Sequence, residues 1–260
     1  MCPFINILGF NISAYALCIF IGIGIGTIVA ISRNKINYQQ KDDIFNAILY
    51  GIIGLMIGGK ILYLAINFKE LLQYLKSFNE NLQNLLAMMQ GGFVFYSGLI
   101  GSIIAIYLYC KRYKINFWNL IDTITPSIPL AHAFGRLGCF CAGCCYGKPY
   151  PSPIGMMFNN SNVAPHGITL FPVQLLEATL NLILFIILII YGRKKRKNGN
   201  MICFYLVAYS IIRFILEYFR YDELRGIMFG ISTSQWISIL IVVVVGLNFI
   251  IKHLKNRYRI

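Results

Sequence analysis

Long apolar stretches recur along this chain, and their length constrains the fold more than any other feature of the sequence. A helix that crosses a bilayer needs about 20 mostly apolar residues. Stretches of that kind lie near 12–32, 45–67, 92–110, 117–138, 173–192, 201–220 and 234–251. Only 12% of the residues are charged, whereas a soluble domain has about 25%. The sequence therefore predicts an all-α, polytopic membrane protein with seven transmembrane helices.

The distribution of basic residues predicts how these helices are oriented. With the N-terminus outside, 15 of the 23 Lys and Arg residues fall on the cytoplasmic side, six fall outside, and Lys60 and Arg213 lie within spans. Short cytoplasmic loops are enriched in Lys and Arg, so we expect the N-terminus outside and the C-terminus in the cytoplasm. No basic surface domain remains outside the spans, so the net charge of +14 does not predict a nucleic-acid partner.

Residues 68–90, between the second and third predicted spans, have leucines and aromatic residues at helical spacing with polar residues between them. This pattern predicts a helical segment in the outer membrane interface, and a polar connector without lipid contact fits it equally well. The chain has no detectable repeat and no low-complexity tail. We therefore expect one membrane-embedded domain over residues 1–260.

Charged residues within predicted spans are costly and usually functional. Arg213 and Glu217 are four residues apart and share a helix face, which fits either a structural ion pair or a site. Arg136 is predicted near the same outer side, where two arginines could hold a phosphate or a carboxylate. Lys60 could extend its ammonium group to the outer interface. Asp122 fits a cytoplasmic-side cap as well as a functional role.

Other residues are predicted to serve helix starts and helix packing. Ser232 and Gln235 have the spacing of a capping box, and Glu177 lies early in the fifth span, so structural roles are favoured for both sites. Gly54 and Gly58 form a small-xxx-small pair that would let another helix approach closely.

A cysteine cluster lies at the outer end of the fourth predicted span: Cys139, Cys141, Cys144 and Cys145. Zinc and iron–sulfur sites usually take ligands from two separated pairs, and no distant partner pair is present. Disulfides form in oxidising compartments, yet adjacent cysteines rarely bridge each other. Buried or reactive free thiols are the third alternative. The spacing alone leaves the role of the cluster open.

Several motifs occur in a characteristic order: "ISAYALCIFIGI", "GGFVFYSGLIGS", "HAFGRLGCFCAGCCYGKP", "FPVQLLE", "RFILEYFR" and "STSQW". Together they resemble the bacterial prolipoprotein diacylglyceryl transferase family. That resemblance implies a multi-pass enzyme of the bacterial plasma membrane that takes a diacylglyceryl group from phosphatidylglycerol. The acceptor would be the thiol of the lipobox cysteine in a preprolipoprotein, in the first step of lipoprotein maturation. No metal or other cofactor is implied.

The resemblance also implies roles for individual residues. Arg136 and Arg213 would hold the phosphate of the lipid and stabilise it as it departs, and Glu217 would orient Arg213. The resemblance also implies contacts with the substrate from Tyr15, Asp122 and Gly147. Gly138, in the same motif as Arg136, and Lys60, within a span, are expected to contact the substrate as well.

This chain departs from the family pattern at positions expected in the site. Tyr96 stands where better-known members have histidine, Cys139 and Ala142 replace two asparagines, and Cys144 replaces a glutamate. The obvious proton acceptors for a thiol are therefore missing. Three alternatives follow: a variant transferase in which the arginines lower the pKa of the acceptor thiol, an enzyme that uses Cys139 and Cys144 as a covalent carrier or redox pair, or a lipid-binding or transport relative without catalysis.

Overall fold

A computed structural model describes residues 3–7, 10–37, 39–76, 78–161, 163–221 and 226–257. The helices are α1 Ala14–Ser32, α2 Lys41–Ile66, α3 Phe68–Lys76, α4 Phe78–Gln90, α5 Phe95–Tyr113, α6 Phe117–Ile124, α7 Ser127–Ala142, α8 Val173–Tyr191, α9 Asn200–Leu216, the 3-10 turn η1 Glu217–Phe219, and α10 Thr233–Arg257. Two short antiparallel hairpins accompany them: β1 Phe4–Ile7 with β2 Phe10–Ser13, and β3 Ile227–Met228 with β4 Ile231–Ser232.

Five of the described helices are long and apolar enough to cross a membrane: α1, α2, α8, α9 with η1, and α10. The chain is thus a mainly helical, multi-pass membrane protein. The predicted span at 117–138 is divided into α6 and α7 at Pro126, because proline has no N–H and disfavours helix in the residue before it. The predicted span at 92–110 corresponds to α5. The count of seven spans and the orientation of the termini stay predictions.

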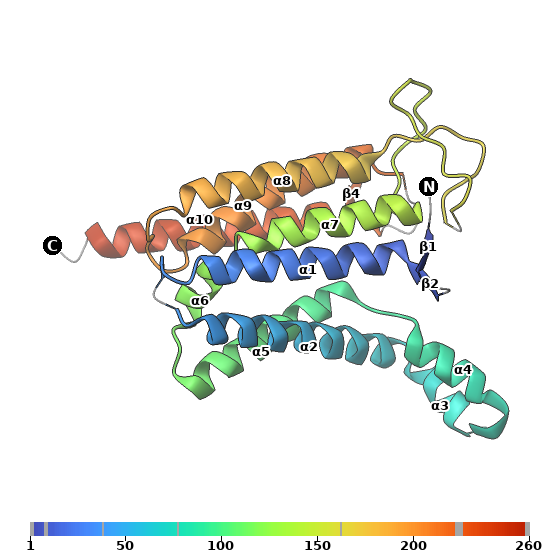
Figure 1. The fold of residues 1–260 in the computed structure, drawn as a ribbon, viewed down its shortest axis with the longest axis horizontal. Coiled ribbons are helices and arrows are strands. Elements are labelled where there is room, and N and C mark those ends of the chain that lie inside the picture. The colour runs from blue at the N-terminus through green and yellow to red at the C-terminus, as the bar shows by residue number, and fades with distance from the viewer. Residues whose placement is uncertain are drawn as a thin grey trace. The chain divides into compact units, whose positions relative to one another are not determined.

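The chain forms two compact units, residues 1–37 with 121–260, and residues 38–120. In the first unit α1 packs on α7, α7 on α8, α8 on α9 and α9 on α10 (Figure 1). Small residues permit the close approach of α1 and α7. A Cβ atom on Gly22 would lie 2.6 Å from Cβ of Phe134, and one on Gly138 would lie 3.1 Å from Cα of Tyr15. Gly138 therefore serves helix packing beside Tyr15.

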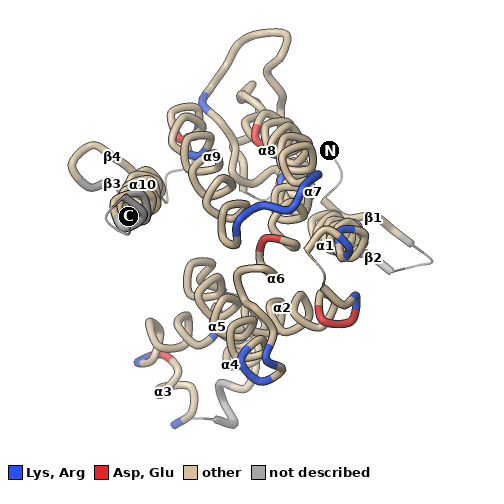
Figure 2. Tube along the Cα trace, turned by 90° about the vertical axis from the view of Figure 1, so that its left-hand side faces the viewer, with Lys and Arg blue, Asp and Glu red and all other residues tan. Residues whose placement is uncertain are grey.

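One end of this bundle is held by single charged side chains that cap helices. Asp122 accepts hydrogen bonds from the backbone N–H groups of Gly199 (2.7 Å) and Ile202 (3.1 Å), at the start of α9. Arg33 donates to the carbonyl of Gly192 (2.9 Å), at the end of α8. Figure 2 shows basic residues along the connection between α8 and α9 at this end.

The position of Asp122 favours the capping role over contact with substrate. Its carboxylate satisfies the first N–H groups of α9. Arg213 lies 11 residues after Ile202 on the same helix, and at 1.5 Å per residue that separation is roughly 16 Å. Asp122 is therefore a capping residue, the alternative that the sequence had left open.

The second unit is built on the packing of α2 against α5. A Cβ on Gly54 would lie 2.5 Å from the carbonyl oxygen of Gly101, and one on Gly58 would lie 2.6 Å from that of Ser97. The predicted close approach at this small-residue pair is confirmed. The predicted helical segment at 68–90 consists of α3 and α4, and its location in the membrane interface stays a prediction.

Lys60 of α2 has structural partners within the second unit. Its Nζ donates to the carbonyls of Met88 (2.7 Å) and Gly91 (2.5 Å), at the end of α4, and it lies 5.0 Å from the ring centroid of Tyr63. An ammonium group has three donors, and the unpaired carbonyls at a helix end accept them. Lys60 thus holds α4 to α2, and we assign it no contact with substrate.

The segment between α7 and α8 folds back on the end of the first unit. Phe158 and Leu170 are fully buried in it, and Phe140 of α7 packs against them. Gly147 donates to the carbonyl of Phe171 (3.1 Å), and a Cβ there would lie 2.5 Å from that oxygen. Gly147 is required for the close backbone contact that fixes this loop beside the site.

Candidate active site

Glu177 lies at the centre of a charged cluster formed by three helices of the first unit. Its Oε1 is 3.1 Å from Nε of Arg136 on α7, and its Oε2 is 3.9 Å from Nη1 of Arg213 on α9. The Glu177 side chain is 2% exposed, and those of the arginines are 15% and 13% exposed. The two arginines converge, as the sequence predicted, but around a carboxylate of the protein. The structural role favoured for Glu177 therefore includes holding both guanidinium groups.

Arg213 is held from its other side by residues near the chain turn after α9. Its Nη2 lies 2.8 Å from Oε2 of Glu217 and donates to Oγ of Ser234 at 3.0 Å. Ser234 is positioned by the start of α10, where Ser232 and Gln235 exchange hydrogen bonds of 3.1 and 3.2 Å. This confirms the predicted capping box. The expectation that Glu217 orients Arg213 agrees with this geometry.

His132 is a member of the cluster that the sequence analysis missed. Nε of Arg136 donates to its Nε2 at 3.2 Å, and that nitrogen lies 3.5 Å from Oε1 of Glu177. Its ring contacts the ring of Tyr209, with centroids 5.2 Å apart. The signal was its position four residues before Arg136, on the same face of α7.

These contacts leave hydrogen-bond donors available at the centre of the site. All the polar contacts of Arg136 with described residues fall on Nε, so its two terminal nitrogens have no partner among them. Nη1 of Arg213 is buried and also has no hydrogen-bond partner among the described residues. The arginines balance Glu177 and Glu217 in charge. The cluster can therefore accept an anion that brings its own hydrogen-bond acceptors.

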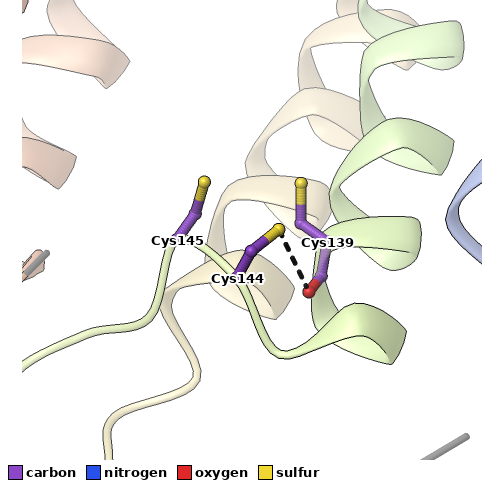
Figure 3. A group of neighbouring side chains, drawn as sticks. All are labelled: Cys139, Cys144 and Cys145. Atoms are coloured by element: carbon purple, nitrogen blue, oxygen red, sulfur yellow. Dashed lines mark hydrogen bonds between the residues drawn. The ribbon is translucent and has the colours of Figure 1, made fainter. Parts of the chain in front are cut away.

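Three thiols gather beside this cluster, where α7 ends. The Sγ atoms of Cys139, Cys144 and Cys145 all lie within 4.8 Å of one another, and Figure 3 shows them facing a common space. Gly143 ends α7 in the left-handed conformation, with φ of 71°, and so turns the chain back. Cys144 consequently donates its N–H to the carbonyl of Cys139 at 3.1 Å. All the described cysteines are free.

The loop that bears these thiols is fixed by its neighbours. Gln174 of α8 donates to the carbonyl of Cys144 at 2.9 Å. Cys145 has φ of 57°, which is uncommon for a residue other than glycine. Hydrogen bonds from the thiols of Cys139 and Cys144 lower the pKa of the Cys145 thiol, and the charges of Arg220 and Arg136 lower it further.

Comparison with known proteins places the chain among relatives. A model of the prolipoprotein diacylglyceryl transferase family matches residues 3–251. The chain belongs to this family. A relative from Clostridium tetani named phosphatidylglycerol–prolipoprotein diacylglyceryl transferase is 38% identical over 239 residues, which are 92% of each chain.

Two further relatives span most of the chain. A Clostridium perfringens protein named phosphatidylglycerol–prolipoprotein diacylglyceryl transferase 2 is 36% identical over 252 residues, 97% of this chain and 95% of the relative. A Clostridioides difficile protein with the same name, without the numeral, is 30% identical over 236 residues, 90% and 88% of the two chains.

The family's expected site residues fall in both units. Tyr15 of α1 packs on Gly138 and interacts electrostatically with Arg136 and Cys139, so it lies beside the cluster. Tyr96 belongs to α5 in the second unit, where its ring is exposed and meets Phe95 edge-on. The first unit alone therefore contains the arginines, the thiols and Tyr15.

Proposed function

We propose that this protein transfers the diacylglyceryl group of phosphatidylglycerol to the thiol of a lipobox cysteine, the first step of lipoprotein maturation. Two observations support the proposal: membership of the family, and the convergence of Arg136 and Arg213 on Glu177 with donors that have no hydrogen-bond partner among the described residues. The relatives named above carry this donor and this acceptor in their names. The donor is a lipid and the acceptor a membrane-bound preprolipoprotein, so the reaction belongs at the bacterial plasma membrane.

The reaction is a displacement at carbon. The sulfur of the acceptor, after losing its proton, attacks the glyceryl carbon that bears the phosphate. A carbon–sulfur bond forms, the carbon–oxygen bond breaks, and its electron pair leaves with glycerol phosphate. Negative charge therefore grows on the phosphate, and the terminal nitrogens of Arg136 and Nη1 of Arg213 are placed to stabilise it. The product is a thioether.

His132 and Glu177 act through Arg136 in this proposal. Both contact its Nε, so the side chain is held from behind and its two terminal nitrogens form the fork that binds phosphate oxygens. Glu217 and Ser234 do the same for Arg213. These four are positioning residues, and the two arginines are the catalytic ones. Tyr15 is proposed to line the donor site near the headgroup.

We also propose the topology of seven spans with the N-terminus outside. In this arrangement the ends of α7 and α9 that hold the arginines face the outer leaflet, and the capped end with Asp122 faces the cytoplasm. The basic connection between α8 and α9 lies on the cytoplasmic side, as expected from the enrichment of Lys and Arg in such loops.

A reconstituted assay tests the function. The purified protein in phosphatidylglycerol nanodiscs receives a lipobox peptide, and both glycerol phosphate release and the peptide mass are measured. The proposal expects equal amounts of glycerol phosphate and diacylglyceryl-peptide. Lipid retention without glycerol phosphate release would contradict it and support a binding or transport role. A diacylglycerol mass on the protein itself would instead identify Cys139 or Cys144 as a covalent carrier.

A further inference from the structure

We propose that Cys139, Cys144 and Cys145 bind one zinc-class metal ion with an open fourth position that takes the thiol of the acceptor. This inference rests on the proposed function for the identity of the acceptor. It revises the expectation that no metal is involved. No second cysteine pair is present in the sequence, but the turn at the end of α7 brings three potential ligands together within one short segment.

The distances suit a thiolate site. Zinc binds sulfur at about 2.3 Å in tetrahedral geometry, which places neighbouring sulfur atoms roughly 3.8 Å apart. The three Sγ atoms already lie within 4.8 Å of one another, so closure requires movements of about 1 Å. Two hydrogen bonds hold the backbone that carries these side chains. The N–H of Cys144 donates to the carbonyl of Cys139, and the side-chain amide of Gln174 donates to the carbonyl of Cys144.

The backbone at Cys145 is a second observation that favours a built site. Its left-handed conformation costs free energy for a residue with a side chain. The Cys145 side chain lies beside those of Cys139 and Cys144 (Figure 3), with all three Sγ atoms within 4.8 Å of one another.

Charge at the site also fits a metal held by thiolates. Three thiolates and a divalent ion carry a net charge of minus one, and a fourth thiolate from the acceptor makes it minus two. The charges of Arg136 and Arg220 both act on Cys145, so they offset part of that excess. Arg136 also pairs with Glu177, so its charge is shared between the two groups.

Exposure leaves one side of the site open. Cys139 is buried at the end of α7, whereas Cys144 and Cys145 are partly exposed on the loop. Catalytic zinc sites have three protein ligands and keep the fourth position for substrate, and a thiol that coordinates zinc is deprotonated. The site would thus supply what the chain lacks at the positions of the family's histidine and glutamate, a means to ionise the acceptor.

The chemical step then balances without a further reactant. The acceptor thiol binds the ion as thiolate and releases its proton to water. Its sulfur attacks the glyceryl carbon of the donor, and the carbon–oxygen electron pair leaves with the phosphate held by Arg136 and Arg213. The resulting thioether is a neutral, weaker ligand than a thiolate, so the product dissociates and the site is free again.

Cobalt(II) gives a direct test, because its absorption reports the number of thiolate ligands. We expect the metal-depleted full-length protein to bind one cobalt ion with sulfur-to-cobalt charge-transfer bands, and a lipobox peptide to increase their intensity. A peptide with serine in place of cysteine should not. Absence of cobalt binding, or a spectrum unchanged by the cysteine peptide, would overturn the proposal.

Matched variants locate the site. The triple change Cys139→Ser, Cys144→Ser and Cys145→Ser should abolish cobalt binding, whereas the control triple Cys18→Ser, Cys141→Ser and Cys203→Ser should bind as the original chain does. If the first triple variant does not fold, Cys145→Ala alone should remove about a third of the charge-transfer intensity. Equal cobalt binding by original chain and site variants would refute the assignment.

Activity separates this inference from the proposed function. Chelation should reduce transfer at pH 7 by up to about 30-fold, and zinc should restore it, because a free thiol with a pKa of about 8.5 is only a few per cent ionised there. Full transfer by the metal-free protein would overturn the metal site and leave the transferase function standing. Cobalt and peptide binding without glycerol phosphate release would support the site and overturn the function.

Discussion

Charged side chains are buried at both ends of the first unit, but their partners differ. At one end Asp122 and Arg33 each meet backbone groups of a helix terminus. At the other end Arg136, Arg213, Glu177 and Glu217 meet one another. A capping side chain forms hydrogen bonds with backbone groups that cannot move away, and it stabilises the helix end. Side chains paired with side chains can exchange their partners for a ligand, so the second arrangement is the one suited to chemistry.

Both ends leave one buried guanidinium nitrogen without a hydrogen-bond partner among the described residues: Nε of Arg33 at the capped end and Nη1 of Arg213 at the site. The ends differ in their carboxylates, because both oxygens of Asp122 accept backbone hydrogen bonds, whereas Glu177 and Glu217 face arginines. An unsatisfied buried donor costs about 1–3 kcal/mol, and a bound phosphate would recover that cost. Variants at the two ends should therefore affect different measurements.

Loss of either arginine should have the largest effect. Arg136→Ala or Arg213→Ala removes charge-assisted contacts that strengthen in the transition state, and we expect glycerol phosphate release to fall by about 10³-fold. The matched control is Arg196→Ala: Arg196 lies in the connection after α8, with its guanidinium over the ring of Tyr191 at the end of that helix. Near-normal turnover of both site variants would show that the arginines do not bind the donor.

Glu177→Gln should affect stability next most strongly. The change leaves two buried guanidinium groups with one carboxylate, and we expect the free energy of unfolding in detergent to fall by about 3 kcal/mol. Phosphatidylglycerol should raise the Tm of this variant more than that of the original chain, because its phosphate replaces the lost charge. Equal Tm gains for the two proteins would argue against a shared site for Glu177 and phosphate.

Substitution of His132 tests its role as a positioning residue. His132→Leu removes the acceptor for Nε of Arg136, and we expect KM for phosphatidylglycerol to rise about tenfold, since a hydrogen bond to a charged group contributes about 1.5 kcal/mol. The kcat should change less. His132→Gln keeps an acceptor and should recover most of the affinity. A loss confined to kcat, or no recovery with glutamine, would contradict positioning.

The capped end should show the smallest effect, and none on chemistry. Asp122→Ala removes the acceptor for two N–H groups of α9, which should lower the free energy of unfolding by about 1 kcal/mol. The kcat and KM measured well below the Tm should stay unchanged. A large fall in kcat with an intact fold would erase the distinction between the two ends.

Local features of the sequence predicted much of this structure. The predicted spans near 12–32, 45–67, 173–192 and 234–251 match α1, α2, α8 and α10 closely, because the length of an apolar run is a property of consecutive residues. The capping box of Ser232 and Gln235 was also recognisable, since both partners lie within four positions. The ordered motifs identified the family for the same reason.

Contacts between residues distant in sequence could not be predicted in this way. Asp122 caps a helix that begins 78 residues later, and Lys60 binds carbonyls about 30 residues away, so neither position revealed its partner. Glu177 was interpreted as a residue at a helix start. Its motif "FPVQLLE" contains no sign that α7 and α9 bring Arg136 and Arg213 to its two carboxylate oxygens.

Consecutive residues are enough to establish that the chain is apolar, helical and a member of one transferase family, and to identify its arginines within spans. Which charged side chains meet depends on the packing of helices, because packing sets distances that periodicity does not fix. The fold also brings together three of the four clustered cysteines. Gly143 reverses the chain at the end of α7, so Cys144 and Cys145 lie beside Cys139, which is five and six positions earlier.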